Sequence, residues 1–152
     1  RLEAIPSFFI THTYFWGDRH YAIFMGPERA VRMSPTGDAL RCNLPFTLHS
    51  DTFVTPIDPL LLVWSAVNRL SYGGRDLGKA EQGIPVLEAL KGITINAARQ
   101  GFEEGVKGSI EPGKFADFVV LDENPLAVDP MHLKDIEIAA TIVGDVLAYG
   151  AL

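Results

Sequence analysis

A short apolar run that ends on a carboxylate is the feature that most constrains this chain. Residues 45–52 are Pro-Phe-Thr-Leu-His-Ser-Asp-Thr, a composition that predicts a strand. Because successive side chains of a strand point to opposite faces, we expect Thr47, His49 and Asp51 to share one face. A parallel β/α architecture presents its catalytic acids where the strands end. A Ser-Asp pair after a strand is also a common turn or helix cap, so the rest of the chain must decide.

The elements around this run favour a parallel sheet. An earlier strand is expected over residues 5–12, followed by a loop over residues 14–20. Short helices are expected to begin near Gly26-Pro27 and at Ser34-Pro35, where Ser34 can act as the N-cap. After the central strand, Asp58 can cap a helix that begins at Pro59 and ends near residue 70. This alternation predicts an α/β fold and not an antiparallel sandwich.

The second half of the chain changes from helix to strand. A helix is expected from about Pro85 to a break at Gly92, and a second helix over residues 95–100. Strands are expected over residues 115–122, 136–143 and 146–149, and Gly144-Asp145 suits a tight hairpin turn between the last two. The sequence therefore predicts two parts, residues 1–106 and residues 107–152.

Composition excludes several classes of function. The 152 residues are 47% hydrophobic, which is ample for a core, and carry a formal charge of −6. Without a dense Lys/Arg cluster, no nucleic-acid partner is expected. No apolar run is long enough to span a bilayer, so no membrane partner is expected. Cys42 is the only cysteine, and we expect a buried thiol.

The ends of the chain leave its location open. The sequence begins on Arg-Leu-Glu without a starting Met or a signal-peptide pattern. We therefore expect it to be cut from a longer protein, whose localisation stays unknown, with the cytoplasm weakly favoured.

The segment from His12 to His20 contains an unusually high share of residues that can bind a ligand. Aromatic, acidic, basic and imidazole side chains are crowded there, and Trp16 lies at its centre. Such a segment suits recognition of a ligand, and equally suits packing under a lid. We give even odds that His12 faces a functional site. His20 lies beyond the expected strand end, and we expect it to be solvated.

Several motifs together resemble one family. They cover nearly the whole chain and occur in the family's order: His-Thr-Tyr-Phe-Trp-Gly-Asp at 12–18, Leu-His-Ser-Asp-Thr-Phe-Val-Thr-Pro at 48–56, Thr-Ile-Asn-Ala-Ala at 94–98, Lys-Gly-Ser-Ile-Glu-Pro-Gly-Lys-Phe-Ala-Asp-Phe-Val-Val-Leu-Asp at 107–122 and Thr-Ile-Val-Gly-Asp at 141–145. The set resembles the C-terminal third of metal-dependent amidohydrolases, in the branch with N-substituted formamide deformylases, YtcJ-like hydrolases and exoenzyme-regulatory AepA-like proteins.

The resemblance implies a fold and a site. It implies the last two strands and helices of a (β/α)8 TIM barrel, followed by strands of a small β-sandwich domain. Asp51 would end the eighth barrel strand, where the family's acid touches the metal and takes the proton of the attacking water. His12 would end the seventh strand and contact substrate. Trp16 would also contact substrate. His49 replaces the commoner Gly and, on the face of Asp51, would line the pocket or act as a barrel histidine.

The resemblance also implies a divalent metal, usually zinc, in the full-length protein. The family's His-x-His pair does not occur here, and one carboxylate with one or two imidazoles is not a closed zinc site. We therefore expect the chain alone to bind no metal and to be inactive.

Three hypotheses stay open on the sequence. The first is a metal-dependent hydrolase that cleaves a C–N bond, amide or formamide-like, of a small molecule. The second is a regulatory or interaction protein on the same scaffold, since fold does not fix function. The third is a self-sufficient α/β domain in which Asp51 only forms a turn. Because two strands cannot close a barrel, we expect the excised chain to self-associate. An Asp51 carboxylate turned to bulk water, or antiparallel pairing of its strand, would weaken the hydrolase assignment.

Overall fold

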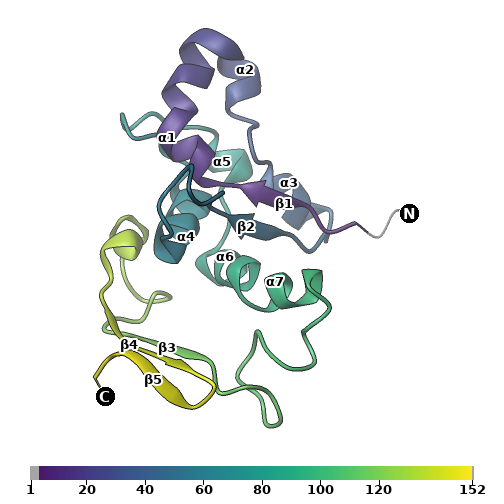
Figure 1. Cartoon of the computed structure of the whole chain (residues 1–152). Helices are drawn as coiled ribbons and strands as arrows, with labels where there is room; N and C mark the ends of the chain where they lie inside the picture. Colours follow the sequence, from purple (N-terminus) through teal and green to yellow (C-terminus); the bar gives the residue numbers. More distant parts are fainter. Residues whose placement is uncertain (1–3, 152) are drawn as a thin grey trace.

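The central strand pairs in parallel with the first strand of the chain. The computed structural model describes residues 4–151. In it β1 (Ser7–Phe9) and β2 (Thr47–His49) form a two-stranded parallel sheet that aligns Phe8 with Leu48 and Phe9 with His49. Figure 1 shows this pair beside α4, with α6 and α7 below it in the view. The parallel α/β expectation is therefore confirmed, and closure into a barrel stays a prediction.

The loop expected after β1 is instead a helix. α1 (Thr11–Arg19) continues directly into a π-helical turn, η1 (His20–Phe24). The prediction failed because Gly17 and several aromatic residues give the segment weak helix propensity. Packing overrides it: a Cβ on Gly17 would lie 2.2 Å from Leu77 Cδ1, and Tyr14 packs edge-on against Trp64 at 5.5 Å between ring centroids. Only glycine permits that approach to Leu77.

The short helices lie close to where the sequence placed them. α2 (Pro27–Ala30) begins on its proline, and α3 is Thr36–Arg41. Ser34 does not cap α3, because its backbone is left-handed and its hydroxyl instead donates to the carbonyl of Phe9 at 3.4 Å. The expected burial of Cys42 is wrong, since this residue lies exposed at the end of α3.

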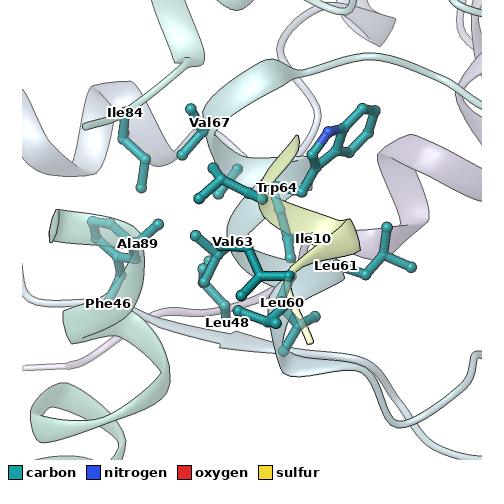
Figure 2. Packing of buried hydrophobic residues seen from close by; sticks show 14 of the residues in the cluster. Ile10, Phe46, Leu48, Leu60, Leu61, Val63, Trp64, Val67, Ile84 and Ala89 are labelled. Atoms are coloured by element: carbon teal, nitrogen blue, oxygen red, sulfur yellow. The ribbon is translucent and has the colours of Figure 1, made fainter. Parts of the chain in front are cut away.

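The helix after β2 forms as predicted and lies at the centre of the hydrophobic core. α4 (Pro59–Asn68) begins on Pro59, and Asp58 Oδ1 accepts a hydrogen bond from the Leu61 amide at 2.9 Å. Figure 2 shows the packing around Val63 of α4, which is fully buried. The helix is surrounded by β1–β2, by later helices and by a C-terminal segment; the labelled neighbours include Ile10, Phe46, Leu48, Ile84 and Ala89.

Three further helices follow α4 in the chain. They are α5 (Lys79–Gln82), α6 (Val86–Ile93) and α7 (Ile95–Gln100). The break between α6 and α7 falls at Thr94, with φ −124° and ψ −98°, and not at Gly92. Gly92 stays helical because it packs against the sheet: an added Cβ would lie 3.1 Å from Leu48 Cγ.

The C-terminal part is a small antiparallel sheet tied to α4. β3 (Phe118–Leu121), β4 (Ile138–Val143) and β5 (Val146–Gly150) pair in the order β3-β4-β5, which confirms the predicted hairpin. Between β3 and β4, the 3-10 helix η2 (Pro130–Asp135) accepts hydrogen bonds from Trp64 and Asn68 at its Met131 and Pro130 carbonyls, at 3.0 and 2.8 Å. The division at residue 107 stays a prediction, because Leu133 and Ile136 join the same core.

No helix among residues 4–151 combines the length and apolar character needed to cross a membrane.

Candidate active site

Three aromatic rings stack where the two parallel strands end. Phe9 closes β1, and its ring lies between two imidazoles. His12 stacks on it at 5.2 Å and 3° between planes, and His49 at 5.4 Å and 19°. Parallel pairing brings this about, because Phe9 and His49 are partners in the register. The stack therefore lies at the edge where a parallel sheet carries its chemistry.

Helix α1 adds a row of side chains to this stack. His12, Trp16 and His20 are spaced by four residues and so lie along one face of the helix. The ring centroids of His12 and Trp16 are 5.3 Å apart, and those of His12 and His20 are 4.6 Å apart at 82°. His12 Nε2 and His20 Nε2 are separated by 3.0 Å, a hydrogen-bond distance.

The environment of His12 favours its neutral form. Burial among the rings, together with the positive charge that His20 would carry, lowers the pKa of His12 below its ordinary value of 6.5. The other nitrogen of His20, Nδ1, is buried without a hydrogen-bond partner among the described residues. A pair of imidazoles in mutual contact resists taking up a second proton.

Asp51 lies in an exposed turn just beyond β2. The strand ends at His49 and Asp51 is left-handed, with φ +51°, so the alternation that placed Thr47, His49 and Asp51 on one face does not reach it. That part of the prediction is wrong. The turn is closed by a 2.7 Å hydrogen bond from the Val54 amide to the Asp51 carbonyl.

A second contact ties this turn to helix α1. The Thr55 hydroxyl donates to the carbonyl of Ser50, and its oxygen lies 3.2 Å from the hydroxyl oxygen of Thr11 at the start of α1. The turn that carries Asp51 is thereby anchored beside the end of β1. The exposure of Asp51 in this chain is the outcome that weakens the hydrolase assignment, whereas the parallel pairing of β2 agrees with that assignment.

The described residues do not form a metal site by themselves. Within residues 4–151 no three His, Cys, Asp or Glu side chains gather closely enough to hold a metal ion. A catalytic zinc needs about three protein ligands. Asp51 can supply one ligand at most, so a complete metal centre would need ligands from outside these residues.

The sequence found most members of this cluster and missed two. His12, Trp16 and His49 were predicted from different elements, and the structure brings all three around Phe9. Phe9 and His20 were missed. The spacing of His12, Trp16 and His20 would have indicated the pair had residues 11–24 been interpreted as helix. The remaining histidine, His132, is exposed, and its Nε2 lies 2.8 Å from Glu123 Oε1.

A parallel βα pair with imidazole side chains at the strand ends and a carboxylate in the turn beyond is typical of the α/β fold class. A model of the Amidohydrolase family matches residues 1–149, and the chain belongs to this family.

Its relatives are longer proteins. Putative amidohydrolase YtcJ of Bacillus subtilis (strain 168) is 38% identical over 103 residues, 66% of this chain and 19% of the relative. N-substituted formamide deformylase of Arthrobacter pascens is 30% identical over 122 residues, 80% of this chain and 22% of the relative. An uncharacterized metal-dependent hydrolase of Pyrococcus horikoshii OT3 matches with a TM-score of 0.69 and 26% identity, over 86% of this chain and 26% of its own. The chain thus spans about a quarter or less of each.

Acidification is expected to destabilise the fold through His12. The pKa of His12 in the folded protein lies below its ordinary value of 6.5, which applies to the unfolded chain. At a pH between these two pKa values the unfolded chain binds more protons than the folded protein, so stability rises with pH. The contribution of neutral His12 is complete above about pH 6.5 and is lost as the pH falls towards the folded-state pKa. Thermal midpoints of the full-length protein and of His12→Gln, measured from about pH 7.5 to 5.5, should show a steeper loss in the wild type. Parallel curves would contradict this assignment.

Proposed function

We propose that the protein containing this chain is a metal-dependent hydrolase of small molecules that cleaves an amide or formamide-like C–N bond. The observation that carries the proposal is the cluster at the carboxyl ends of β1 and β2, where the family's motifs and the imidazole stack coincide. Family membership supports hydrolysis, and the metal-dependent hydrolase of similar fold supports a divalent metal, for which zinc is our choice. The formamide deformylase relative supports the type of bond.

Asp51 is proposed as the catalytic acid–base residue. Its carboxylate would accept a proton from the attacking water and deliver it to the leaving nitrogen, a role that requires an ionised carboxylate at a strand end near the scissile bond. We also propose Asp51 as one metal ligand, with the remaining ligands supplied from outside residues 4–151. The chain alone is then inactive and binds no metal.

His12, Trp16 and His49 are proposed to line the substrate side of the site. Stacking on Phe9 holds both imidazoles at the strand ends, and Trp16 packs against Phe9 at 6.1 Å and supplies an apolar wall. A pocket with an apolar wall and a few polar groups suits a small organic substrate. Self-association of the isolated chain also stays a proposal.

Metal content and turnover of the full-length protein test this function together. We expect about one or two equivalents of a divalent metal by elemental analysis and hydrolysis of at least one compound in a panel of formamides, amides, ureas and lactams. Removal of the metal with a chelator should abolish turnover, and added Zn²⁺ should restore it. A protein that is folded and metal-free and cleaves none of these compounds would contradict the proposal.

A further inference from the structure

The contact between His12 and His20 determines where both rings carry their protons. Their Nε2 atoms lie 3.0 Å apart. Two imidazole nitrogens can share a hydrogen bond only if one carries the proton and the other offers a lone pair. A single N–H therefore lies between them, and the pair has two possible arrangements: His20 donates to His12, or His12 donates to His20.

The buried edge of His20 distinguishes these arrangements. Its Nδ1 is buried and has no hydrogen-bond partner among residues 4–151. If His12 were the donor, neutral His20 would carry its proton on Nδ1, and this N–H would be buried and unpaired. Unpaired buried N–H groups are rarer than under-satisfied acceptors. His20 therefore carries its proton on Nε2 and donates it to Nε2 of His12.

This arrangement also determines the tautomer of His12. Because His12 accepts at Nε2 and is held neutral by its surroundings, its one proton lies on Nδ1. Within the described residues this Nδ1 makes no hydrogen bond, so the N–H is available to a ligand. The ring cannot turn freely, because Phe9 stacks on its face and Trp16 lies against it.

The backbone and a neighbouring ring fix the place of the His20 side chain. His20 begins the π-helical turn η1, in which the Met25 amide donates to the His20 carbonyl at 2.9 Å. Phe24 packs against the His20 ring at 5.6 Å between centroids. π-helical turns occur frequently at functional sites, where they change the direction of a side chain.

We propose that His20 is a positioning residue: it holds His12 in the Nδ1–H form, so that His12 donates a hydrogen bond to an oxygen atom of the substrate. The inference rests on the proposed function, in which His12 contacts substrate. A neutral imidazole donor suits a carbonyl oxygen, and its hydrogen bond strengthens as negative charge develops on that oxygen during attack by water. The site would thus favour substrates that place a carbonyl oxygen beside His12.

Two substitutions of His20 separate positioning from packing. In the full-length protein, His20→Gln retains an N–H donor at the end of the side chain, whereas His20→Leu keeps apolar volume and loses the donor. We expect His20→Leu to lower kcat/KM by about tenfold to a hundredfold, the usual contribution of partners that orient site residues, and His20→Gln to retain most of the activity. His132→Gln, at an exposed histidine outside the site, serves as the matched control and should change nothing.

Nuclear magnetic resonance of the ¹⁵N-histidine-labelled full-length protein tests the tautomer without relying on activity. At about pH 7.5, above the ordinary histidine pKa, His12 should be protonated at Nδ1, and in His20→Leu its signals should move towards a mixture of both tautomers. Protonation of wild-type His12 at Nε2, or equal activity of the Leu and Gln variants, would overturn the proposal. If the spectra agree but the wild type hydrolyses no compound of the panel, the proposed function fails and the positioning of His12 by His20 stands.

Discussion

Replacing Asp51 by Asn in the full-length protein is expected to abolish hydrolysis without unfolding the protein. Asn keeps the size of the side chain but can neither accept a proton from water nor carry one to the leaving nitrogen. The expected loss in kcat is about a hundredfold to ten-thousandfold, the range of general acid–base catalysis. Because Asp51 is exposed in a turn, the same change should leave the thermal midpoint within a few degrees.

The control for this substitution is another exposed carboxylate, next to the small C-terminal sheet. Asp122 follows β3 directly and lies outside the imidazole cluster, so Asp122→Asn should leave both activity and stability unchanged. If Asp51→Asn hydrolyses its substrate as well as the wild type, the catalytic role of Asp51 is wrong. A regulatory phenotype of the full-length protein that survives Asp51→Asn would favour the scaffold hypothesis over the enzyme.

Local sequence signals correctly placed the ends of those elements that are determined by residues close together in the chain. Asp58 and Pro59 predicted the start of α4 because a carboxylate cap and a first-turn proline act within four residues. Gly144-Asp145 predicted the turn between β4 and β5 for the same reason. Helix α1 was missed because the contacts that stabilise it, Gly17 with Leu77 and Tyr14 with Trp64, join residues 50 or more positions apart.

The candidate site likewise contains features that local sequence predicts and features that depend on distant contacts. The motif containing Asp51 could be found from the sequence. The strand expected to end on His12 instead ends at Phe9, and His12 lies in the first turn of α1. The stack of His12 and His49 on Phe9 depends on the register of β1 against β2, which no local signal specifies. The pairing of His12 with His20 depends on the helical state of α1, so an error in secondary structure removed a residue from the site.

Arg69 is the residue whose loss should cost the most stability. It follows α4 in a left-handed conformation, with φ +54°, and its side chain is fully buried. The guanidinium donates to four backbone carbonyls: those of Leu77 at 3.2 Å, Ser34 at 3.1 Å, Met33 at 2.6 Å and Val31 at 3.5 Å. Burial lowers the pKa of Arg69 to about 10, which leaves the guanidinium charged at neutral pH.

These bonds join the α2–α3 connection to the chain after α4. A planar group with five N–H donors is required to reach carbonyls in several directions, and no other side chain provides it. The Ser34 carbonyl also accepts from the Thr36 amide at 2.7 Å, so Arg69→Met should leave the other three carbonyls, of Val31, Met33 and Leu77, without a partner. We expect this to lower the free energy of unfolding by roughly 3 kcal/mol or more, since each orphaned buried group costs about 1–3 kcal/mol. Arg69→Lys should recover only part of the loss, because an ammonium group cannot span the four acceptors.

The exposed Arg75 is the matched control for this measurement. Its guanidinium pairs with Asp18 at 3.0 Å and lies over the Tyr21 ring at 4.3 Å, both at the surface. Exposed ion pairs contribute about 0–1 kcal/mol, so Arg75→Met should shift the unfolding midpoint of the full-length protein far less than Arg69→Met. If urea or thermal unfolding gave equal shifts for the two variants, the carbonyls of Val31, Met33 and Leu77 would have to find other partners without Arg69. The connection between α2 and α3 would then be held by its apolar contacts and not by a buried cation.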